Sequence, residues 1–194
     1  VNPQACAEAI RALIKELNLD LKVSVVLGDD LLEHKDKFLD SGILEMYSDE
    51  KFPEVDKIAS INAYLGAFPI AQALNDGADI VITGRSVDSA VTLAACIHTF
   101  GWKEDEYDKL ASGSLAGHII ECGTQSTGGN FTDWELSSKN LHMIGYPIVD
   151  VSENGEFICT KSNNTSGLVS FGTVAEQMLY EIGDPQAYIL PDVV

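Results

Sequence analysis

The feature that most constrains the fold is the short apolar segment Asp79–Thr83 (DIVIT), which lies between Gly77 and Gly84. A continuous apolar run of this length, bounded by glycines, is typical of a buried strand. A helix is expected before it over Gly66–Asn75, and another short strand before that helix over Ile58–Ala63. Strand, helix and strand in this order form a βαβ unit, which requires parallel strands and a right-handed crossover.

The rest of the chain continues the alternation of helical and β-rich segments. Helices are expected at residues 1–17, 87–100, 106–122 and 173–182, and strands at 21–27, 148–151 and 157–160. Asn154-Gly155 between the last two strands is typical of a type I′ hairpin turn, and Thr173 with Glu176 of a capping box. The fold class is therefore α/β, with a mostly parallel sheet flanked by helices and a β-hairpin in the last third.

Two weaker signals concern the internal organisation. Gly113 and Gly117 in the helix over 106–122 predict either close helix packing or a later helix start. Residues 29–57 are the most charged and least periodic part, and are expected to form a solvated helix and loop. One α/β domain is expected over 1–194, with any sub-boundary at 130–145 before the hairpin. The missing Met and the apolar ending suggest an interior fragment of a longer protein.

Composition excludes several classes of protein. The hydrophobic content of 45% is too high for a disordered chain, and no apolar run approaches the roughly 20 residues of a membrane helix. The net charge of −18, from 12 basic and 30 acidic residues, disfavours nucleic acid and anionic membranes as partners. The four cysteines stand apart without a CxxC pair, which predicts no metal site and a reducing, cytoplasmic location: Cys6, Cys96, Cys122 and Cys159.

The carboxyl ends of the parallel strands are where an open α/β sheet binds ligands. The better candidate follows the strand Asp79–Thr83, where Arg85 is a rare cation in an acidic chain and Ser86 or Asp88 can cap the next helix. Free helix amides and one Arg can hold a small anionic substrate. An ordinary turn with Arg85 paired to Asp88 or another acid is the alternative. The ligand-binding candidates at the two strand ends are Asn62, Gly84, Arg85, Ser86 and Asp88.

A third candidate is the segment from His118 to the glycine-rich turn at 127–129. His118 and Cys122 lie one helical turn apart, and a thiol beside an imidazole is the minimum set for an activated nucleophile. Glu121 can act as acid or base, and the turn Thr127-Gly128-Gly129 presents amides for an anion. A buried cysteine and a hydrogen-bonded structural histidine are the alternative. Neither GxxxxGK[ST] nor GxGxxG is present, so no cofactor is expected.

Several motifs in the same order resemble the acyclic terpene utilisation AtuA family. They are Asn62-Ala63-Tyr64-Leu65-Gly66, Ala78 to Arg85, Asp88-Ser89-Ala90, Gly101-Trp102, Ala116-Gly117-His118, Glu121-Cys122-Gly123, Thr127-Gly128-Gly129, Leu179 to Ile182, Asp184-Pro185 and Tyr188 to Val194. The resemblance covers nearly the whole chain. It provides no established catalytic residue to transfer.

The resemblance implies a role in the catabolism of acyclic terpenes and branched acids through coenzyme A thioesters. The expected activity is of lyase or hydratase type on a branched acyl-CoA or related carboxylate, with proton transfer next to the carbonyl and coenzyme A present only as part of the substrate. The alternative is a non-catalytic binding or assembly module. Such a module would bind an acyl-CoA carboxylase or form a homo-oligomer.

Overall fold

The computed structural model describes residues 2–193, which form two compact units. The first unit contains residues up to 65 together with 76–86, and the second contains 66–75 and the residues from 87 onward. The single domain over 1–194 and the sub-boundary at 130–145 stay predictions.

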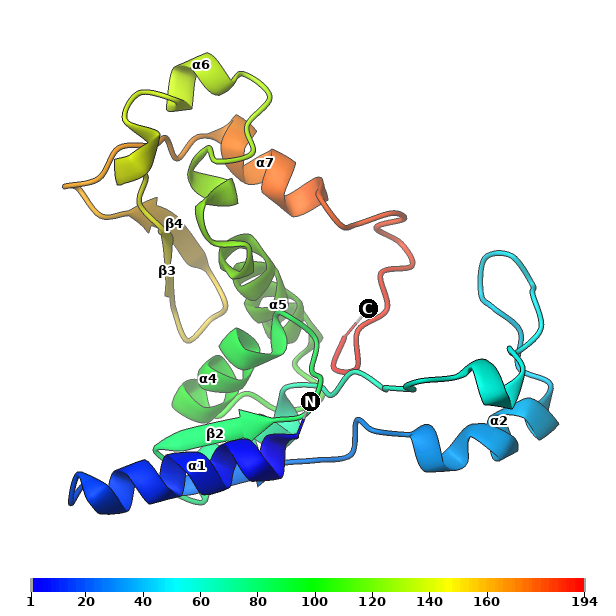
Figure 1. The fold of residues 1–194 in the computed structure, drawn as a ribbon. Coiled ribbons are helices and arrows are strands. Elements are labelled where there is room, and N and C mark those ends of the chain that lie inside the picture. The colour runs from blue at the N-terminus through cyan, green and yellow to red at the C-terminus, as the bar shows by residue number, and fades with distance from the viewer. Residues whose placement is uncertain (1, 194) are drawn as a thin grey trace. The chain divides into compact units, whose positions relative to one another are not determined.

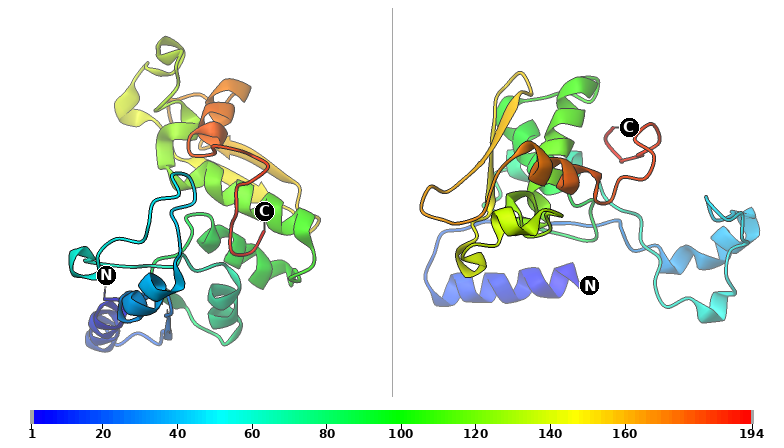
Figure 2. Two further views of the ribbon diagram at one scale, coloured as in Figure 1. Left: turned by 90° about the vertical axis from the view of Figure 1, so that its right-hand side faces the viewer. Right: turned by 90° about the horizontal axis from the view of Figure 1, so that it is seen from above.

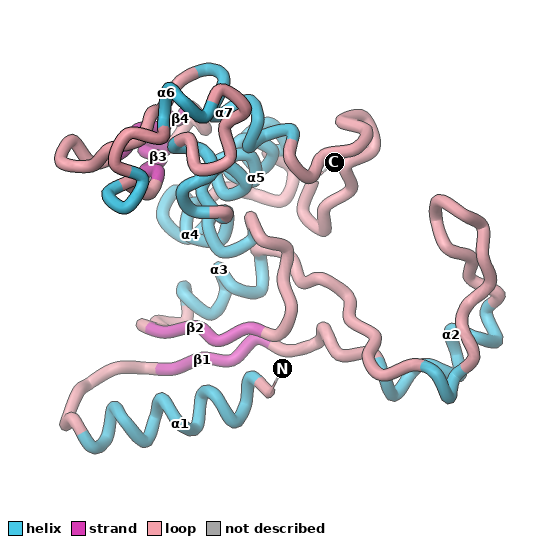
Figure 3. Tube along the Cα trace, turned by 45° about the horizontal axis from the view of Figure 1, so that its top comes forward, coloured by secondary structure: helices cyan, strands magenta, loops and turns pink. Residues whose placement is uncertain are grey.

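The first unit is built on two parallel strands and one long helix. The helix α1 (Pro3–Glu16) begins as its sequence predicts, because Asn2 Oδ1 accepts a hydrogen bond of 3.0 Å from the Ala5 amide and proline occupies the first turn. The strands β1 (Val23–Val26) and β2 (Ile80–Thr83) pair in parallel register. In Figure 3, α1 runs alongside this strand pair, which it contacts.

The predicted mostly parallel sheet is wrong in extent, since β1 and β2 form a two-stranded sheet. The segment Ile58–Ala63 forms no strand of its own and makes one isolated antiparallel bridge, from Asn62 to Asp30. A single parallel bridge joins Leu65 to Ser86. The βαβ unit drawn from residues 58–83 is therefore wrong: the parallel partner of β2 is β1, which lies far upstream in the sequence.

The charged region after β1 is largely solvent-exposed, as predicted for a solvated helix and loop. It contains the short helix α2 (Lys35–Ser41) and single 3₁₀ turns at Leu32–His34 and Val55–Lys57. Gly42 ends α2 in the left-handed conformation.

Helices dominate the second unit (Figure 1). They are α3 (Phe68–Asn75), α4 (Ala90–Phe100), α5 (Tyr107–Glu121), α6 (Trp134–Ser137) and α7 (Phe171–Leu179), with 3₁₀ turns at Gly123–Thr127 and Leu141–Met143. Leu93 of α4 and Leu110 of α5 are almost fully buried between these helices. Among the described helices, none combines the length and apolar character needed to cross a bilayer.

Close packing of α4 against α5 explains two of the helical glycines. A Cβ on Gly117 would lie 2.8 Å from the Ser89 main-chain oxygen, and a Cβ on Gly113 would lie 2.7 Å from Leu93 Cδ1. The glycines predicted either close helix packing or a later helix start. Since α5 begins at Tyr107, close packing is the correct alternative.

The β-hairpin consists of β3 (Pro147–Val151) and β4 (Phe157–Lys161), which pair in antiparallel register as predicted. The type I′ turn is wrong, because Gly155 has φ +91° while Asn154 does not have a positive φ. The Gly155 amide donates to the Ser152 carbonyl, and Ser152 N to Glu156 O, which makes a longer loop with the glycine in the left-handed position.

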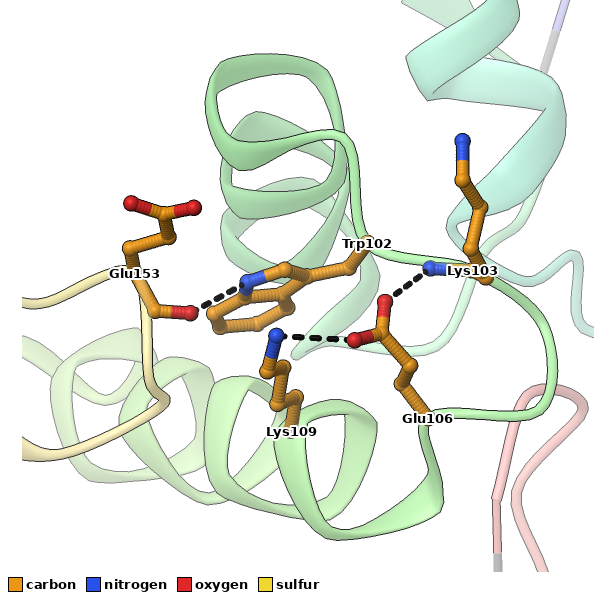
Figure 4. Close-up of polar contacts among 5 residues, drawn as sticks. All are labelled: Trp102, Lys103, Glu106, Lys109 and Glu153. Carbon is orange, nitrogen blue, oxygen red and sulfur yellow. Dashed lines mark hydrogen bonds and ion pairs between the residues drawn. The ribbon is translucent and has the colours of Figure 1, made fainter.

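Trp102 connects this hairpin to the helices (Figure 4). Its indole Nε1 donates a hydrogen bond of 2.9 Å to the Glu153 carbonyl, and the side chain is 2% exposed. Beside it, the Glu106 carboxylate accepts from the Lys103 amide and from Lys109 Nζ, at 2.7 and 2.8 Å. These contacts lower the pKa of Glu106, with the Lys109 hydrogen bond the largest cause.

The capping box of α7 lies three residues earlier than predicted. Ser170 Oγ accepts from Thr173 N at 3.2 Å and Thr173 Oγ1 accepts from Ser170 N at 2.9 Å, so Thr173 and Glu176 do not form the box. The helix ends at Leu179, and the chain continues to residue 193 without helix or strand (red in Figure 2).

Candidate functional site

In the first unit, the predicted ligand residues gather around Asp29, a residue that the sequence reasoning missed. Asp29 follows β1 and is 7% exposed. Its Oδ2 accepts hydrogen bonds from the Arg85 main-chain amide at 2.7 Å and from Asn62 Nδ2 at 3.0 Å. The pKa of Asp29 is lowered, mainly by the hydrogen bond from the Arg85 amide. This effect outweighs burial, which by itself raises the pKa.

Gly84 is required by the same contact, because a Cβ there would collide with the Asp29 carboxylate. Asn62, Gly84 and Arg85 are therefore brought together, and Ser86 follows in the bridge to Leu65. Asp29 could have been found from the sequence, because it comes just after a predicted strand. The same criterion, a position at the carboxyl end of a strand, selected Asn62 and Arg85.

This geometry changes what the turn after β2 can bind. The Arg85 amide, which could have met an external anion, already donates to the chain's own carboxylate. The Arg85 guanidinium lies over the Tyr64 ring, with Cζ 4.6 Å from the ring centroid, and one terminal nitrogen donates to Tyr64 Oη at 3.3 Å. The Arg85 amide is therefore not available to an external anion at this turn.

In the second unit, an apolar pocket of about 160 Å³ lies beside His118. Its lining residues are Ser89, Ala111, Ser114, Leu115, His118, Ile182, Pro185, Tyr188, Leu190 and Val193. The helix α5 supplies one wall, and the chain after α7 supplies the other. Sequence reasoning found His118 but not this second wall, because residues 182–193 carry no helical or strand periodicity.

His118 is 6% exposed and held by α7. Its Nε2 lies 3.1 Å from the Gln177 carbonyl oxygen and 3.2 Å from that of Met178. Carbonyl oxygens only accept, so Nε2 carries a proton and the lone pair of the neutral ring is on Nδ1. In return, Gln177 Nε2 donates to the His118 carbonyl at 3.0 Å. The Tyr188 ring meets the imidazole edge-on, with centroids 6.4 Å apart.

Three carboxylates gather near Tyr188. Oxygens of Asp88, Glu121 and Glu181 all lie within 4.8 Å of one another, an arrangement that can hold a cation. Burial raises the pKa of the Tyr188 phenol, and the charges of Glu181, Asp88 and Glu121 raise it further. The expectation of no metal stays a prediction.

The surroundings of Cys122 favour the thiol over the thiolate. Cys122 follows α5, and its thiol donates to the Glu121 carboxylate. Burial and this neighbouring negative charge raise the pKa of Cys122 to about 11. At neutral pH the thiolate is therefore scarce, so the geometry gives the predicted nucleophile no support.

The turn at 127–129 makes its hydrogen bonds within the chain. Thr127 is fully buried, and its Oγ1 donates to the Gly145 carbonyl at 2.6 Å. The amides of Gly128 and Gly129 donate to the carbonyls of Gln125 and Thr124, at 3.0 and 2.8 Å. The ligand role of Thr127, Gly128 and Gly129 stays a prediction. Since Arg85 belongs to the first unit and His118 to the second, their convergence on one cleft also stays a prediction.

Comparison with protein families identifies a match over the whole chain. The family described as acyclic terpene utilisation family protein AtuA matches residues 1–194. No curated protein and no solved structure matches the chain. The family match spans the whole sequence, including the residues around His118 and Arg85. The chain belongs to the AtuA family of acyclic terpene utilisation proteins.

Proposed function

We propose that this protein is an enzyme that acts on a branched acyl-CoA thioester or a related carboxylate and moves a proton next to the carbonyl. A lyase or hydratase reaction fits this description. The observation that carries the proposal is the apolar pocket that His118 helps to line.

The pocket has the size of a short branched hydrocarbon group. A cavity of about 150 Å³ lined by apolar side chains accommodates benzene, so the volume of about 160 Å³ fits a group of about five or six carbons. Each buried CH₂ contributes about 0.8 kcal/mol, so five carbons contribute up to about 4 kcal/mol of binding free energy.

The orientation of His118 supports its role as the base. The carbonyls of Gln177 and Met178 hold the proton on Nε2, so Nδ1 can accept a proton from the carbon next to the thioester carbonyl. We assign Glu121 as a second acid or base and Cys122 as its hydrogen-bond donor. The ligand role of Arg85 is proposed separately, for the first unit alone.

Hydrogen exchange tests the proton-transfer step by itself, whatever reaction follows it. The protein is incubated in D₂O with methyl-branched and straight-chain acyl-CoA thioesters, and mass spectrometry measures deuterium incorporation. We expect the branched thioester to gain deuterium faster, and His118→Gln to abolish the gain. The matched control is His142→Gln, because His142 is exposed in the 3₁₀ turn Leu141–Met143. Full exchange by a folded His118→Gln variant would remove His118 from the mechanism.

A specific observation also favours an assembly role for the second unit. Large apolar side chains are exposed on α6, on the hairpin and the residue before it, and on α7: Trp134 62%, Leu136 67%, Tyr146 71%, Ile158 71% and Phe171 92%. Such residues are typical of a protein interface, either between copies of this chain or with a carboxylase. Light scattering over a concentration series tests the first case. Self-association that Phe171→Ser leaves unchanged would exclude Phe171 from the contact.

A further inference from the structure

We propose that the first unit holds a second binding site, in which a cleft beside β1 binds the ribose of a nucleotide through its 2′- and 3′-hydroxyls. This inference is independent of the thioester proposal, because every residue in it belongs to the first unit. The cleft has a volume of about 620 Å³. It is lined by Asn2, Pro3, Gln4, Leu27, Gly28, Asp29, Asp30, Leu32, Ala59, Ser60 and Asn62.

The cleft lies where an α/β unit binds ligands. Gly28, Asp29 and Asp30 follow the carboxyl end of β1, whose parallel partner is β2. Asp30 and Asn62 are paired in an antiparallel bridge, so their side chains leave the backbone on the same face.

Two hydrogen-bond acceptors remain for a ligand on this face. Asp29 uses its carboxylate to join Arg85 and Asn62, and is a structural residue here. Asp30 Oδ1 accepts from the Leu32 amide at 3.0 Å, which leaves Oδ2. Asn62 donates its Nδ2 to Asp29, which leaves its Oδ1 as an acceptor. Two adjacent acceptors match the two donors of a vicinal diol.

The charge of the lining selects the ligand further. None of the lining residues is Lys, Arg or His, so a phosphate placed against Asp30 would meet an uncompensated carboxylate. The ribose of coenzyme A carries a 3′-phosphate, which this position would repel. A ribose with both hydroxyls free is therefore the preferred group.

The N-terminus of α1 lines the same cleft, where the Gln4 amide can meet a phosphate. In nucleotide-binding α/β folds, a helix N-terminus faces the phosphates and an acidic residue after the next strand binds the ribose. Here α1 is followed by β1 and then by Asp30, and Asn2, Pro3 and Gln4 of the α1 N-terminus line the same cleft. The Gln4 amide, in the first turn, has no acceptor within its helix.

Calorimetric titration of the full chain with ADP, 2′-deoxy-ADP and coenzyme A tests the site. We expect ADP to bind at least about 10-fold more tightly than 2′-deoxy-ADP, because one hydrogen bond to a charged acceptor is lost. Asp30→Asn is expected to weaken ADP about 10-fold and to reduce the preference for the diol. The asparagine keeps an oxygen for the Leu32 amide, so the turn is preserved. Asp56→Asn, which makes the same charge change at an exposed position outside the cleft, is the control.

Three results would overturn the inference. They are no binding of ADP, equal affinity for ADP and 2′-deoxy-ADP, or coenzyme A binding as tightly as ADP. Mapping of amide shifts by NMR gives a second measurement that does not need a variant. Addition of ADP is expected to shift the Gln4 and Asp30 amides, and shifts confined to other residues would place ADP elsewhere.

Discussion

Replacing Gly84 by alanine tests the close approach between the turn after β2 and the Asp29 carboxylate. The new Cβ would overlap that carboxylate, which the Arg85 amide and Asn62 Nδ2 fix at 2.7 and 3.0 Å. Overpacking of this kind costs about 1–3 kcal/mol of unfolding free energy. Asp29→Ala removes two hydrogen bonds to a charged acceptor, at about 1.5–3 kcal/mol each.

The two changes are expected to be strongly non-additive. Once Asp29 is alanine, no carboxylate remains for the Gly84→Ala methyl to strike, so the second change costs little. The coupling free energy should be about 1–3 kcal/mol. Urea titration of the wild type, both single variants and the double variant measures it. Gly183→Ala, at a glycine with open space around its Cβ position, is the control. Costs that add within about 0.5 kcal/mol would refute the collision.

Two further predictions concern α5. Gly117→Ala and Gly113→Ala should each destabilise the protein in urea by about 1–3 kcal/mol, because the first methyl meets the Ser89 main chain and the second meets the buried Leu93 side chain and the Trp102 ring. A loss below about 0.5 kcal/mol for either variant would contradict this reasoning. The Cys122 thiol, with a pKa of about 11, should react slowly with iodoacetamide at pH 7 and faster as the pH rises toward that value. Glu121→Gln should lower this pKa and speed the reaction at pH 8, as followed by peptide mass spectrometry; an unchanged rate would exclude the carboxylate as a cause.

The helices were predictable because their signals are local. Asn2-Pro3 marks the start of α1, and Gly101, with φ +68°, marks the end of α4. Each of these signals acts through backbone conformation or hydrogen bonds within one helical turn. The same holds for the hairpin strands, which a few residues connect.

The sheet was harder because its pairing is not local. Val23 of β1 pairs with Ile80 of β2 across a long stretch of chain. The sequence of neither strand indicates which other strand it pairs with. The segment Ile58–Ala63 contains two β-branched residues, Ile58 and Ile61, yet it makes one isolated bridge and no ladder. Strand propensity indicates that a segment can pair with another strand. Whether it does so depends on its tertiary contacts.

Asp29 shows why a residue of the candidate site can be missed in the sequence. It stands in a run of charged residues most of whose other members are exposed, and its partners Asn62 and Arg85 lie 33 and 56 positions away. The charged composition therefore predicts that Asp29 is exposed to solvent. In the fold its carboxylate is buried and accepts hydrogen bonds from two donors. His118 was found because glycine and cysteine neighbours drew attention to it, but its contacts with Gln177 span 59 residues.

Trp102 gives the second unit a natural optical reporter. Its indole is 2% exposed and bonded to Glu153, whereas Trp134, the other tryptophan, is 62% exposed. With Trp134→Phe, the emission of the remaining indole should be blue-shifted and protected from iodide quenching. Detachment of the hairpin loop would move that emission to the red, so a fluorimeter alone can follow the hairpin's docking while ligands are added.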